Sequence, residues 1–89
     1  MRSETRPTFW RCYRGLPEDV RREVRLAYRM WLTDPYQPSL RFKSMSGKSN
    51  LWSVRVNNRG YRVMGVREKD LMTWFFVGRH DEYLRSVKN

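Results

Sequence analysis

The sequence predicts a single α+β domain over residues 1–89, in which N-terminal helices pack on one face of an antiparallel β-meander and a short C-terminal helix follows. Two observations support this fold class. Apolar residues recur at helical spacing between Leu16 and Trp31, and from Leu40 onward they alternate with a period of two. A chain of 89 residues has room for one modest hydrophobic core, so we expect no second domain.

Helical segments come first. Phe9–Arg14 is predicted as a helical turn, and residues 1–8 as either a frayed end or a weak edge strand. A longer helix begins at Pro17, which suits a first helical position, and ends at Asp34, because Pro35 disfavours helical geometry in the residue before it. The apolar stripe of this helix consists of Leu16, Val20, Val24, Ala27, Tyr28 and Trp31.

Strands fill the second half of the chain, after a connector over residues 36–40. The predicted strands cover residues 52–56, 61–66 and 71–77, and polar turns at 57–60 and 67–70 join them. Residues 71–77 are apolar on both faces, which is typical of a strand inside a sheet. A short helix is expected to begin near His80, with two acids in its first turn.

The charge balance predicts a polyanionic partner. Lysine and arginine number 19 against 9 acids, and the formal net charge is +10. Nucleic acid is the first expectation and an acidic protein the second. The 4 Trp, 5 Tyr and 4 Phe are many for so small a core, so some should lie on the surface as a partner site or stacking platform.

Several functional classes are excluded by the residues themselves. One cysteine, Cys12, and one histidine, His80, do not make an intrachain zinc site, and we expect neither metal nor cofactor. The chain has no glycine-rich phosphate loop and no nucleophile elbow. A lone cysteine favours a reducing compartment, and no apolar segment is long enough for export or for a bilayer, so a cytoplasmic protein without membrane contact is expected.

Arg55 and Arg62 are the first candidate site residues. Each lies within a predicted strand, and the turn between the strands places them roughly opposite each other. Two neighbouring arginines on a sheet repel unless an anion lies between them, and a phosphate would fill that role. The alternative is a solvated sheet face with acidic partners from elsewhere in the chain.

His80 and Tyr83 follow the last predicted strand, next to Arg79. A histidine takes or gives a proton at cellular pH, although an isolated one is more often a capping or hydrogen-bonded residue. Tyr83 would lie on the same helical face and either stack on a base or pack the helix onto the sheet.

Lys43 and Lys48 flank the Ser- and Gly-containing segment 44–47. This segment is either a loop that closes over a nucleic-acid backbone or a solvated loop with two lysines. Cleavage of RNA without a metal is compatible with these groups. The 2′-hydroxyl is a nucleophile within the substrate, so a protein has only to orient it, neutralise the phosphate and protonate the leaving oxygen.

The order of several short motifs resembles the RelE/ParE toxin superfamily over about residues 9–87. The motifs are Leu16-Pro17-Glu18-Asp19-Val20, Asp34-Pro35, Pro38-Ser39-Leu40-Arg41-Phe42-Lys43, Trp52-Ser53-Val54-Arg55-Val56, Gly60-Tyr61-Arg62-Val63 and Trp74-Phe75-Phe76-Val77-Gly78-Arg79-His80-Asp81-Glu82-Tyr83. This resemblance implies the compact fold of toxins from bacterial type II toxin–antitoxin modules. RelE-like members cleave mRNA, typically in the ribosome, whereas ParE-like members inhibit DNA gyrase.

The resemblance also implies roles for individual residues. Arg62 matches the arginine of the family's Gly-Tyr-Arg motif, Arg55 matches a strand lysine, and His80 matches the basic residue after the last strand, with Arg79 beside it. Tyr83 is nearest to the C-terminal tyrosine and would position a base by stacking, together with Trp74 or Phe76. Ser53 replaces another strand lysine of the pattern, which leaves the proton-transfer role to His80.

The function expected from this resemblance is that of a type II toxin, a metal-independent mRNA endoribonuclease that inhibits translation on the ribosome. Its partners would be a small acidic antitoxin, mRNA and the ribosome. The alternatives are a ParE-like, non-enzymatic inhibitor of DNA gyrase and an inactive RNA-binding member of the superfamily.

Overall fold

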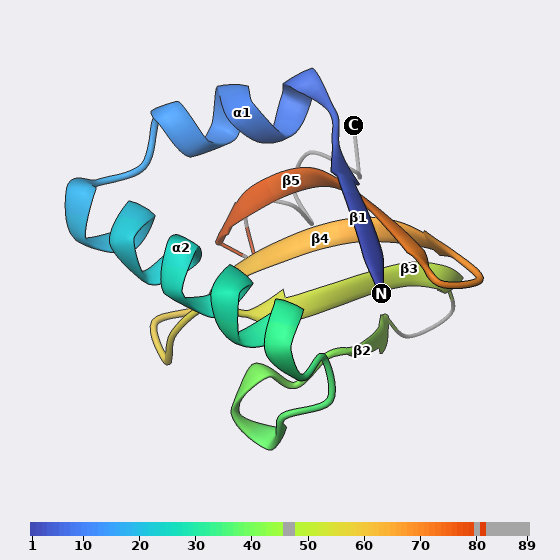
Figure 1. The fold of residues 1–89 in the computed structure, drawn as a ribbon. Coiled ribbons are helices and arrows are strands. Elements are labelled where there is room, and N and C mark those ends of the chain that lie inside the picture. The colour runs from blue at the N-terminus through green and yellow to red at the C-terminus, as the bar shows by residue number, and fades with distance from the viewer. Residues whose placement is uncertain (46–47, 80, 82–89) are drawn as a thin grey trace.

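The computed structural model describes residues 1–45, 48–79 and 81, and the remaining residues are drawn as a grey trace in Figure 1. The elements in chain order are β1 (Arg2–Thr5), α1 (Pro7–Arg14), α2 (Glu18–Thr33), the 3₁₀ turn η1 (Pro38–Leu40), β2 (Lys43–Met45), β3 (Lys48–Arg55), β4 (Tyr61–Glu68) and β5 (Leu71–Arg79). Both α-helices lie on the same side of the sheet (Figure 1). The predicted α+β class is therefore confirmed.

The sheet has five strands in the order β1-β5-β4-β3-β2. Strands β3, β4 and β5 form the predicted antiparallel meander, and β5 is an internal strand, as expected from its apolar residues. The loop predicted at 44–47 is shorter than expected, because Lys43–Met45 forms β2, which pairs with β3, and β3 already begins at Lys48. At the far edge β1 pairs with β5 in parallel, with Arg2 opposite Leu71 and Thr5 opposite Trp74. Of the two alternatives for the first residues, the edge strand is the one that the structure contains.

Local sequence signals account for both helices. Pro7 occupies the first turn of α1, and Gly15 follows its last residue. Helix α2 has Glu18 and Asp19 in its first turn, where carboxylates stabilise the helix dipole, and it ends at Thr33, close to the predicted boundary. Its buried residues are Val20, Val24, Ala27 and Trp31. Tyr28 differs from the prediction because it lies at the rim, 40% exposed.

Alternation along the strands separates two faces of the sheet. Val54, Val63 and Val77 are cross-strand neighbours and are buried beneath the helices. The residues next to them in sequence therefore point to the opposite face, away from the helices. This face, which we call the open face because neither α-helix covers it, carries two cross-strand rows, of which one is Ser53, Met64 and Phe76 and the other is Arg55, Arg62 and Gly78. Within the first row Ser53 and Met64 are nevertheless buried, at 2% and 0% exposed.

A β-bulge interrupts the pairing of β4 with β5. Met64 pairs with Phe76 and Gly65 with Trp74, so Phe75 is the extra residue of the bulge. The Phe75 carbonyl instead accepts a hydrogen bond of 2.8 Å from the Thr8 hydroxyl of α1. A Cβ on Gly65 would lie 2.6 Å from the Thr73 carbonyl oxygen, so the close approach of the two strands requires glycine there.

Aromatic rings fill the space between helices and sheet. Trp31 packs edge to face against Trp74 at 5.3 Å and against Phe42 at 5.7 Å. The indole Nε1 atoms of Trp31 and Trp74 are buried without a hydrogen-bond partner among the described residues, so ring packing rather than polar pairing stabilises this cluster.

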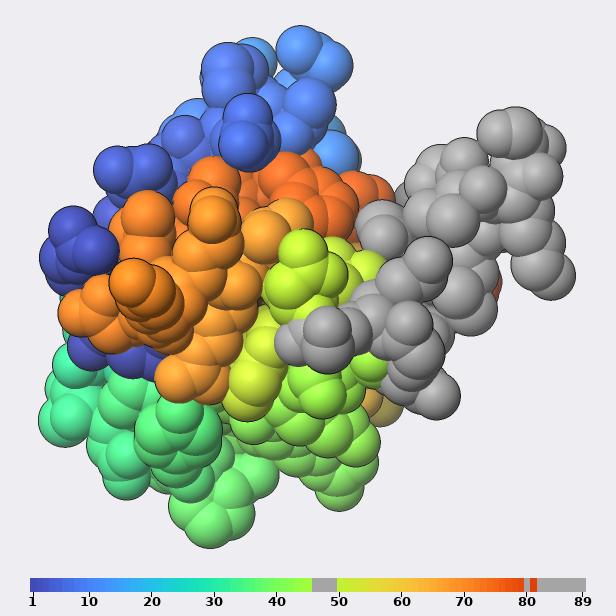
Figure 2. Space-filling model, turned by 90° about the vertical axis from the view of Figure 1, so that its right-hand side faces the viewer, coloured from blue at the N-terminus to red at the C-terminus, as the bar shows by residue number. Residues whose placement is uncertain are grey.

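Two predictions change at the end of the meander. The predicted turn at 67–70 was too long, because β4 continues through Glu68 and only Lys69 and Asp70 lie between the strands. Figure 2 faces this end of the molecule, with the orange β4–β5 region between the blue N-terminal segment and the green chain that leads into β2. The predicted C-terminal helix falls outside the described residues. No helix among those residues is long and apolar enough to cross a membrane.

Candidate functional site

Arg55 and Arg62 lie directly opposite each other on β3 and β4, on the open face of the sheet. The prediction that they are neighbours is therefore confirmed. The β3–β4 hairpin, with Gly60 at a φ of +95° in its turn, fixes this register. The Arg55 side chain turns toward the strand end, where its Nε donates a hydrogen bond of 3.2 Å to the Asn57 carbonyl.

Arg62 is half-buried and lies within a concentration of positive charge. Its Nη1 donates a hydrogen bond of 3.2 Å to the hydroxyl of Ser53, which is 2% exposed. Burial, followed by the charges of Arg41 and Arg55, lowers the pKa of Arg62 from its ordinary value. The neutral hydroxyl of Ser53 orients this guanidinium without neutralising it.

Arg41 and Lys43 complete the group, which we call the open-face cluster: Arg41, Lys43, Arg55 and Arg62. Arg41 follows η1 in the left-handed conformation, with a φ of 46°, and its charge reaches Arg62. Lys43 is the cross-strand partner of Ser53, and its side chain is exposed. Lys43 therefore lies on the same face as Ser53, beside the position where Arg62 donates its hydrogen bond.

None of the four side chains in the open-face cluster forms an ion pair with the rest of the described chain. Other arginines, by contrast, form ion pairs or ring contacts within the fold. Arg59 pairs with Asp19 at 3.3 Å and with Glu23, and the guanidinium of Arg67 lies 4.4 Å from the centre of the Trp52 ring. Among the described residues no carboxylate compensates the charge of the open-face cluster, and a bound anion would neutralise it.

Glu23 of α2 holds the hairpin end that carries Arg55. It accepts a hydrogen bond of 3.0 Å from Asn57 Nδ2 and another from Arg59, whose pKa is raised chiefly by the hydrogen bond to Glu23. Asn57 in turn receives the Nε hydrogen bond of Arg55 at its main-chain oxygen. A continuous path of contacts therefore runs from the helix layer to Arg55.

The structure separates the aromatic residues predicted to contact nucleic acid. Phe76 lies on the open face in the row of Ser53, and its ring covers Gly78, the cross-strand partner of Arg62. Trp74 is 3% exposed and packs against Trp31 in the core. This burial corrects the prediction for Trp74, because a ring without an exposed face cannot stack on a base.

The remaining predicted site residues are more distant or not described. Arg79 pairs with Tyr61 in the row that faces the helices, on the opposite side of the sheet from Arg62, and its Nε lies 3.6 Å from the Asp81 carboxylate. The backbone of Lys48 begins β3, but its side chain lies outside the described part of the structure. His80 and Tyr83 also lie outside the described residues.

Sequence reasoning missed Arg41 and the contact path through Glu23. Arg41 lies in a predicted connector, and nothing local to it predicts a left-handed backbone or proximity to Arg62. Within residues 1–45, 48–79 and 81, no three His, Cys, Asp or Glu side chains gather in a way that would hold a metal ion. The open-face cluster and Ser53 present guanidinium, ammonium and hydroxyl groups, which are hydrogen-bond donors suited to a phosphate.

Comparison with solved structures shows that the fold is that of the RelE/ParE toxins. The chain is similar to the toxin in a RelB-RelE antitoxin-toxin complex from Methanococcus jannaschii, with a TM-score of 0.74, 15% identity and coverage of 93% of this chain and 96% of that one. It is also similar to YafQ from Escherichia coli, with a TM-score of 0.72, 9% identity and coverage of 93% and 98%. A third similar structure is a YoeB/ParE toxin from Agrobacterium tumefaciens, with a TM-score of 0.68, 13% identity and coverage of 90% of this chain and 99% of that one.

These likenesses confirm the resemblance read from the sequence at the level of the fold. No protein-family model matches the sequence, and no curated protein matches it significantly.

Proposed function

We propose that this protein is the toxin of a type II toxin–antitoxin module, and that it acts in the cytoplasm as a metal-independent mRNA endoribonuclease on the ribosome. The observation that carries the proposal is the opposed pair Arg55 and Arg62, whose charges have no carboxylate partner among the described residues. Two of the similar solved structures, one named as a YoeB/ParE toxin and one as an antitoxin-toxin complex, support it.

The proposed reaction uses the nucleophile within RNA. The 2′-hydroxyl loses its proton and attacks the neighbouring phosphorus, and the bond to the 5′-oxygen of the next nucleotide breaks as that oxygen gains a proton. The products are a 2′,3′-cyclic phosphate and a 5′-hydroxyl end. Arg55 and Arg62 stabilise the negative charge that accumulates on the phosphoryl oxygens, which is where preorganised donors contribute most to such a reaction.

Lys43 supplies the cation that is missing at Ser53. The superfamily pattern has a strand lysine where this chain has Ser53, and Lys43 is the cross-strand neighbour of that position. An ammonium group at Lys43 reaches the same phosphate environment from β2, while the smaller Ser53 leaves room for Arg62 to approach. The open-face cluster therefore has as many cations as the superfamily pattern at these positions, but one of them comes from β2 instead of β3.

Three further residues retain roles that follow from the sequence. Phe76, beside the row of Arg62, offers a ring on which a base next to the scissile phosphate stacks. His80 donates or accepts the proton, and Tyr83 positions a base, as the resemblance implies. The partner that restrains the toxin is a small acidic antitoxin, and complexes of RelE with RelB among the similar structures support this expectation.

The test is controlled expression in a bacterial host followed by mapping of mRNA 5′ ends. Wild-type protein should arrest growth and create new 5′ ends within messages, whereas Arg62→Gln should do neither. Arg29→Gln, a change at an exposed arginine of α2, is the matched control and should behave as wild type. Growth arrest with intact messages and DNA damage signalling would establish the gyrase-inhibitor alternative instead, and RNA binding without cleavage or arrest would indicate an inactive member.

A further inference from the structure

A pocket of about 280 Å³ lies between α2, η1 and the end of β3. Its apolar lining consists of Leu26, Ala27, Met30, Leu40 and Val56. Its polar lining consists of Glu23, Ser39, Arg55 and Asn57. Small-ligand sites combine an apolar wall with a few polar groups in this way, and the volume suits a group smaller than the drug-sized ligands that occupy about 300 Å³ or more.

Arg55 connects this pocket to the open face. In the described part of the sheet β2 pairs with β3 as far as Ser53, so Arg55 lies where β3 is the edge strand. It is the cross-strand partner of Arg62 on the open face, and its side chain also lines the pocket beneath α2. A nucleotide whose phosphate binds at the open-face cluster can therefore reach round this edge and place its base in the pocket.

Polar groups of the pocket retain hydrogen-bonding capacity for a ligand. Asn57 and Arg59 donate to the same oxygen of Glu23, Oε1, and no described residue donates to Oε2. Among the described residues the Ser39 hydroxyl has no hydrogen-bond partner, and Arg55 uses only its Nε, which donates to the Asn57 carbonyl. The pocket therefore offers a carboxylate acceptor beside hydroxyl and guanidinium donors.

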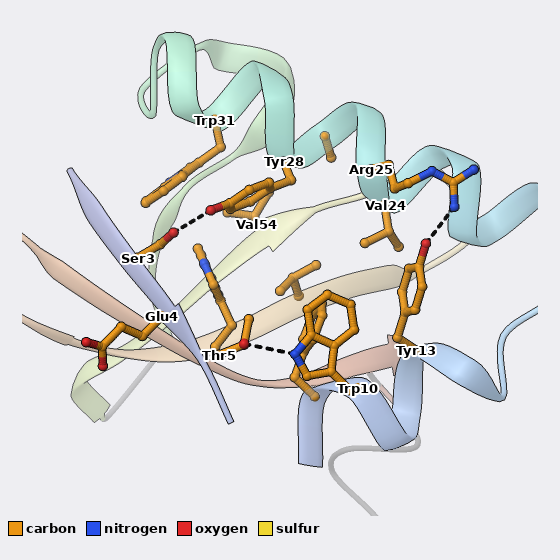
Figure 3. Close-up of a pocket in the computed structure, with 14 residues that line it drawn as sticks. Ser3, Glu4, Thr5, Trp10, Tyr13, Val24, Arg25, Tyr28, Trp31 and Val54 are labelled. Carbon is orange, nitrogen blue, oxygen red and sulfur yellow. Dashed lines mark hydrogen bonds between the residues drawn. The ribbon is translucent and has the colours of Figure 1, made fainter. Parts of the chain in front are cut away.

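A larger apolar cavity on the other side of α2 differs in this respect (Figure 3). Its hydroxyl groups are already hydrogen-bonded within its own lining, Ser3 with Tyr28, Thr5 with Trp10 and Tyr13 with Arg25. Glu4 is the acid of that lining, and Figure 3 shows its carboxylate directed away from the cavity. A ligand that is recognised by hydrogen bonds along its edge therefore fits the smaller pocket better.

We propose that this pocket binds a guanine base of the RNA, next to the phosphate held by Arg55 and Arg62. The flat faces of the base pack on the aliphatic lining, and its two neighbouring N–H groups, N1–H and the 2-amino group, donate to Glu23. Ser39 donates to an acceptor on the opposite edge. A phosphate does not fit there, because the Glu23 carboxylate repels it. The inference rests on the proposed function, because it names the base that the RNA site selects.

The experiment titrates guanosine 3′,5′-bisphosphate, which carries a phosphate on both sides of the ribose, into the ¹⁵N-labelled protein. It should shift the amide signals of Met30, Leu40 and Val56 together with the Nε–Hε signal of Arg62. The uridine and cytidine bisphosphates should bind at least about tenfold more weakly. Inosine 3′,5′-bisphosphate lacks only the 2-amino group, and it should also bind about tenfold more weakly, because one hydrogen bond to a carboxylate is missing.

Paired substitutions separate the pocket from general electrostatics. Glu23→Gln should reduce the guanosine-to-inosine preference at least about fivefold, whereas Asp19→Asn, at the other acid that pairs with Arg59, should leave it unchanged. Ser39→Trp, at an exposed position of the lining, should block the pocket and remove the preference. Thr33→Trp, at an exposed position outside the lining, should retain it. The tryptophan pair decides the question if Glu23→Gln fails to fold.

The proposal is overturned if the four bisphosphates bind alike, or if the guanosine compound shifts Arg62 without the amides of Met30, Leu40 and Val56. Shifts of those amides by acetyl-arginine amide but not by the nucleotide would also overturn it, in favour of a protein partner. None of these measurements requires cleavage, so a chain that prefers guanine without cutting message refutes the proposed activity alone. A chain that cuts message with no guanine beside the cut refutes the pocket alone.

Discussion

Arg55 and Arg62 face each other across two hydrogen-bonded strands, and no described acid forms an ion pair with either one. Like charges at directly opposed positions of a sheet destabilise the fold. The lowered pKa of Arg62 has a related cause, because burial and the charges of Arg41 and Arg55 all disfavour the protonated, positively charged guanidinium. We therefore propose that this pair serves binding rather than stability.

The first prediction compares two arginines of β4. Arg62→Gln should abolish growth arrest and leave the free energy of unfolding unchanged or raise it by about 0.2–1 kcal/mol, because it removes a cross-strand repulsion. Arg67→Gln should lower it by roughly 1 kcal/mol, since Arg67 stacks on Trp52 and donates to the Tyr36 hydroxyl. Urea unfolding measures both. Equal destabilisation by the two changes would mean that Arg62 is structural.

The second prediction concerns inorganic phosphate. At neutral pH the charged form of Arg62 is the populated one, so its lowered pKa is a cost to the folded state. Stability would recover only as the pH rises through the folded-state pKa, far above neutrality, but a bound anion offsets the cost directly. Phosphate at about ten times its Kd should stabilise the fold by about 1.4 kcal/mol and raise Tm by roughly 5–10 °C.

The control for phosphate is sodium chloride at equal ionic strength, which should give a much smaller rise in Tm. Arg62→Gln should lose most of the phosphate effect, and the effect should not fall between about pH 7 and 9, since arginine remains protonated there while phosphate becomes more negative. A rise in Tm that persists undiminished in the Arg62 variant would place the anion elsewhere.

The third prediction concerns the two acids that hold the β3–β4 hairpin. Glu23→Ala should reduce the cleavage rate at saturating RNA several-fold, because Glu23 holds Asn57, whose carbonyl accepts from Arg55. Asp19→Ala should have little effect, since Asp19 contacts Arg59 without contacting Asn57. Cleavage assays on the two purified variants make the comparison. A larger loss in the Asp19 variant would refute positioning through Asn57.

The fourth prediction contrasts two glycines. A Cβ at Gly65 would lie 2.6 Å from the Thr73 carbonyl and 2.9 Å from side-chain atoms of Met72 and Trp74, so Gly65→Ala should cost about 1–3 kcal/mol by overpacking. At Gly60 nothing lies within 4 Å, and Gly60→Ala should cost about 1 kcal/mol from its φ of +95° alone. Thermal unfolding distinguishes them, and a smaller loss at Gly65 would contradict the tight bulge.

Local patterns in the sequence were sufficient for the helices, the hairpin and the opposed arginines. Proline and acids mark the start of α2, and the polar turn at 57–60 sets the register that joins Arg55 to Arg62. The parallel pairing of β1 with β5 and the position of Arg41 depend on contacts between segments far apart in the chain. No local period encodes such contacts, so they appear only in the folded structure.

Trp74 is a second feature that the local sequence pattern does not determine. Its place in an aromatic run predicts either a core residue or a stacking surface, and composition does not decide between them. The bulge at Phe75 does, because it lets Trp74 and Val77 both face the helices while Phe76 faces the open side. One extra residue in β5 therefore determines which ring of the run lies on the open face.

Arginine side-chain NMR with a non-cleavable RNA tests the central claim most directly. A short RNA with a 2′-deoxy substitution at the scissile position should shift the Nε–Hε signals of Arg55 and Arg62. Both signals should follow the same binding curve and give the same Kd. The signals of Arg22 and Arg29 on α2 should remain in place. Shifts confined to the arginines of α2, with Arg55 and Arg62 unmoved, would contradict the account.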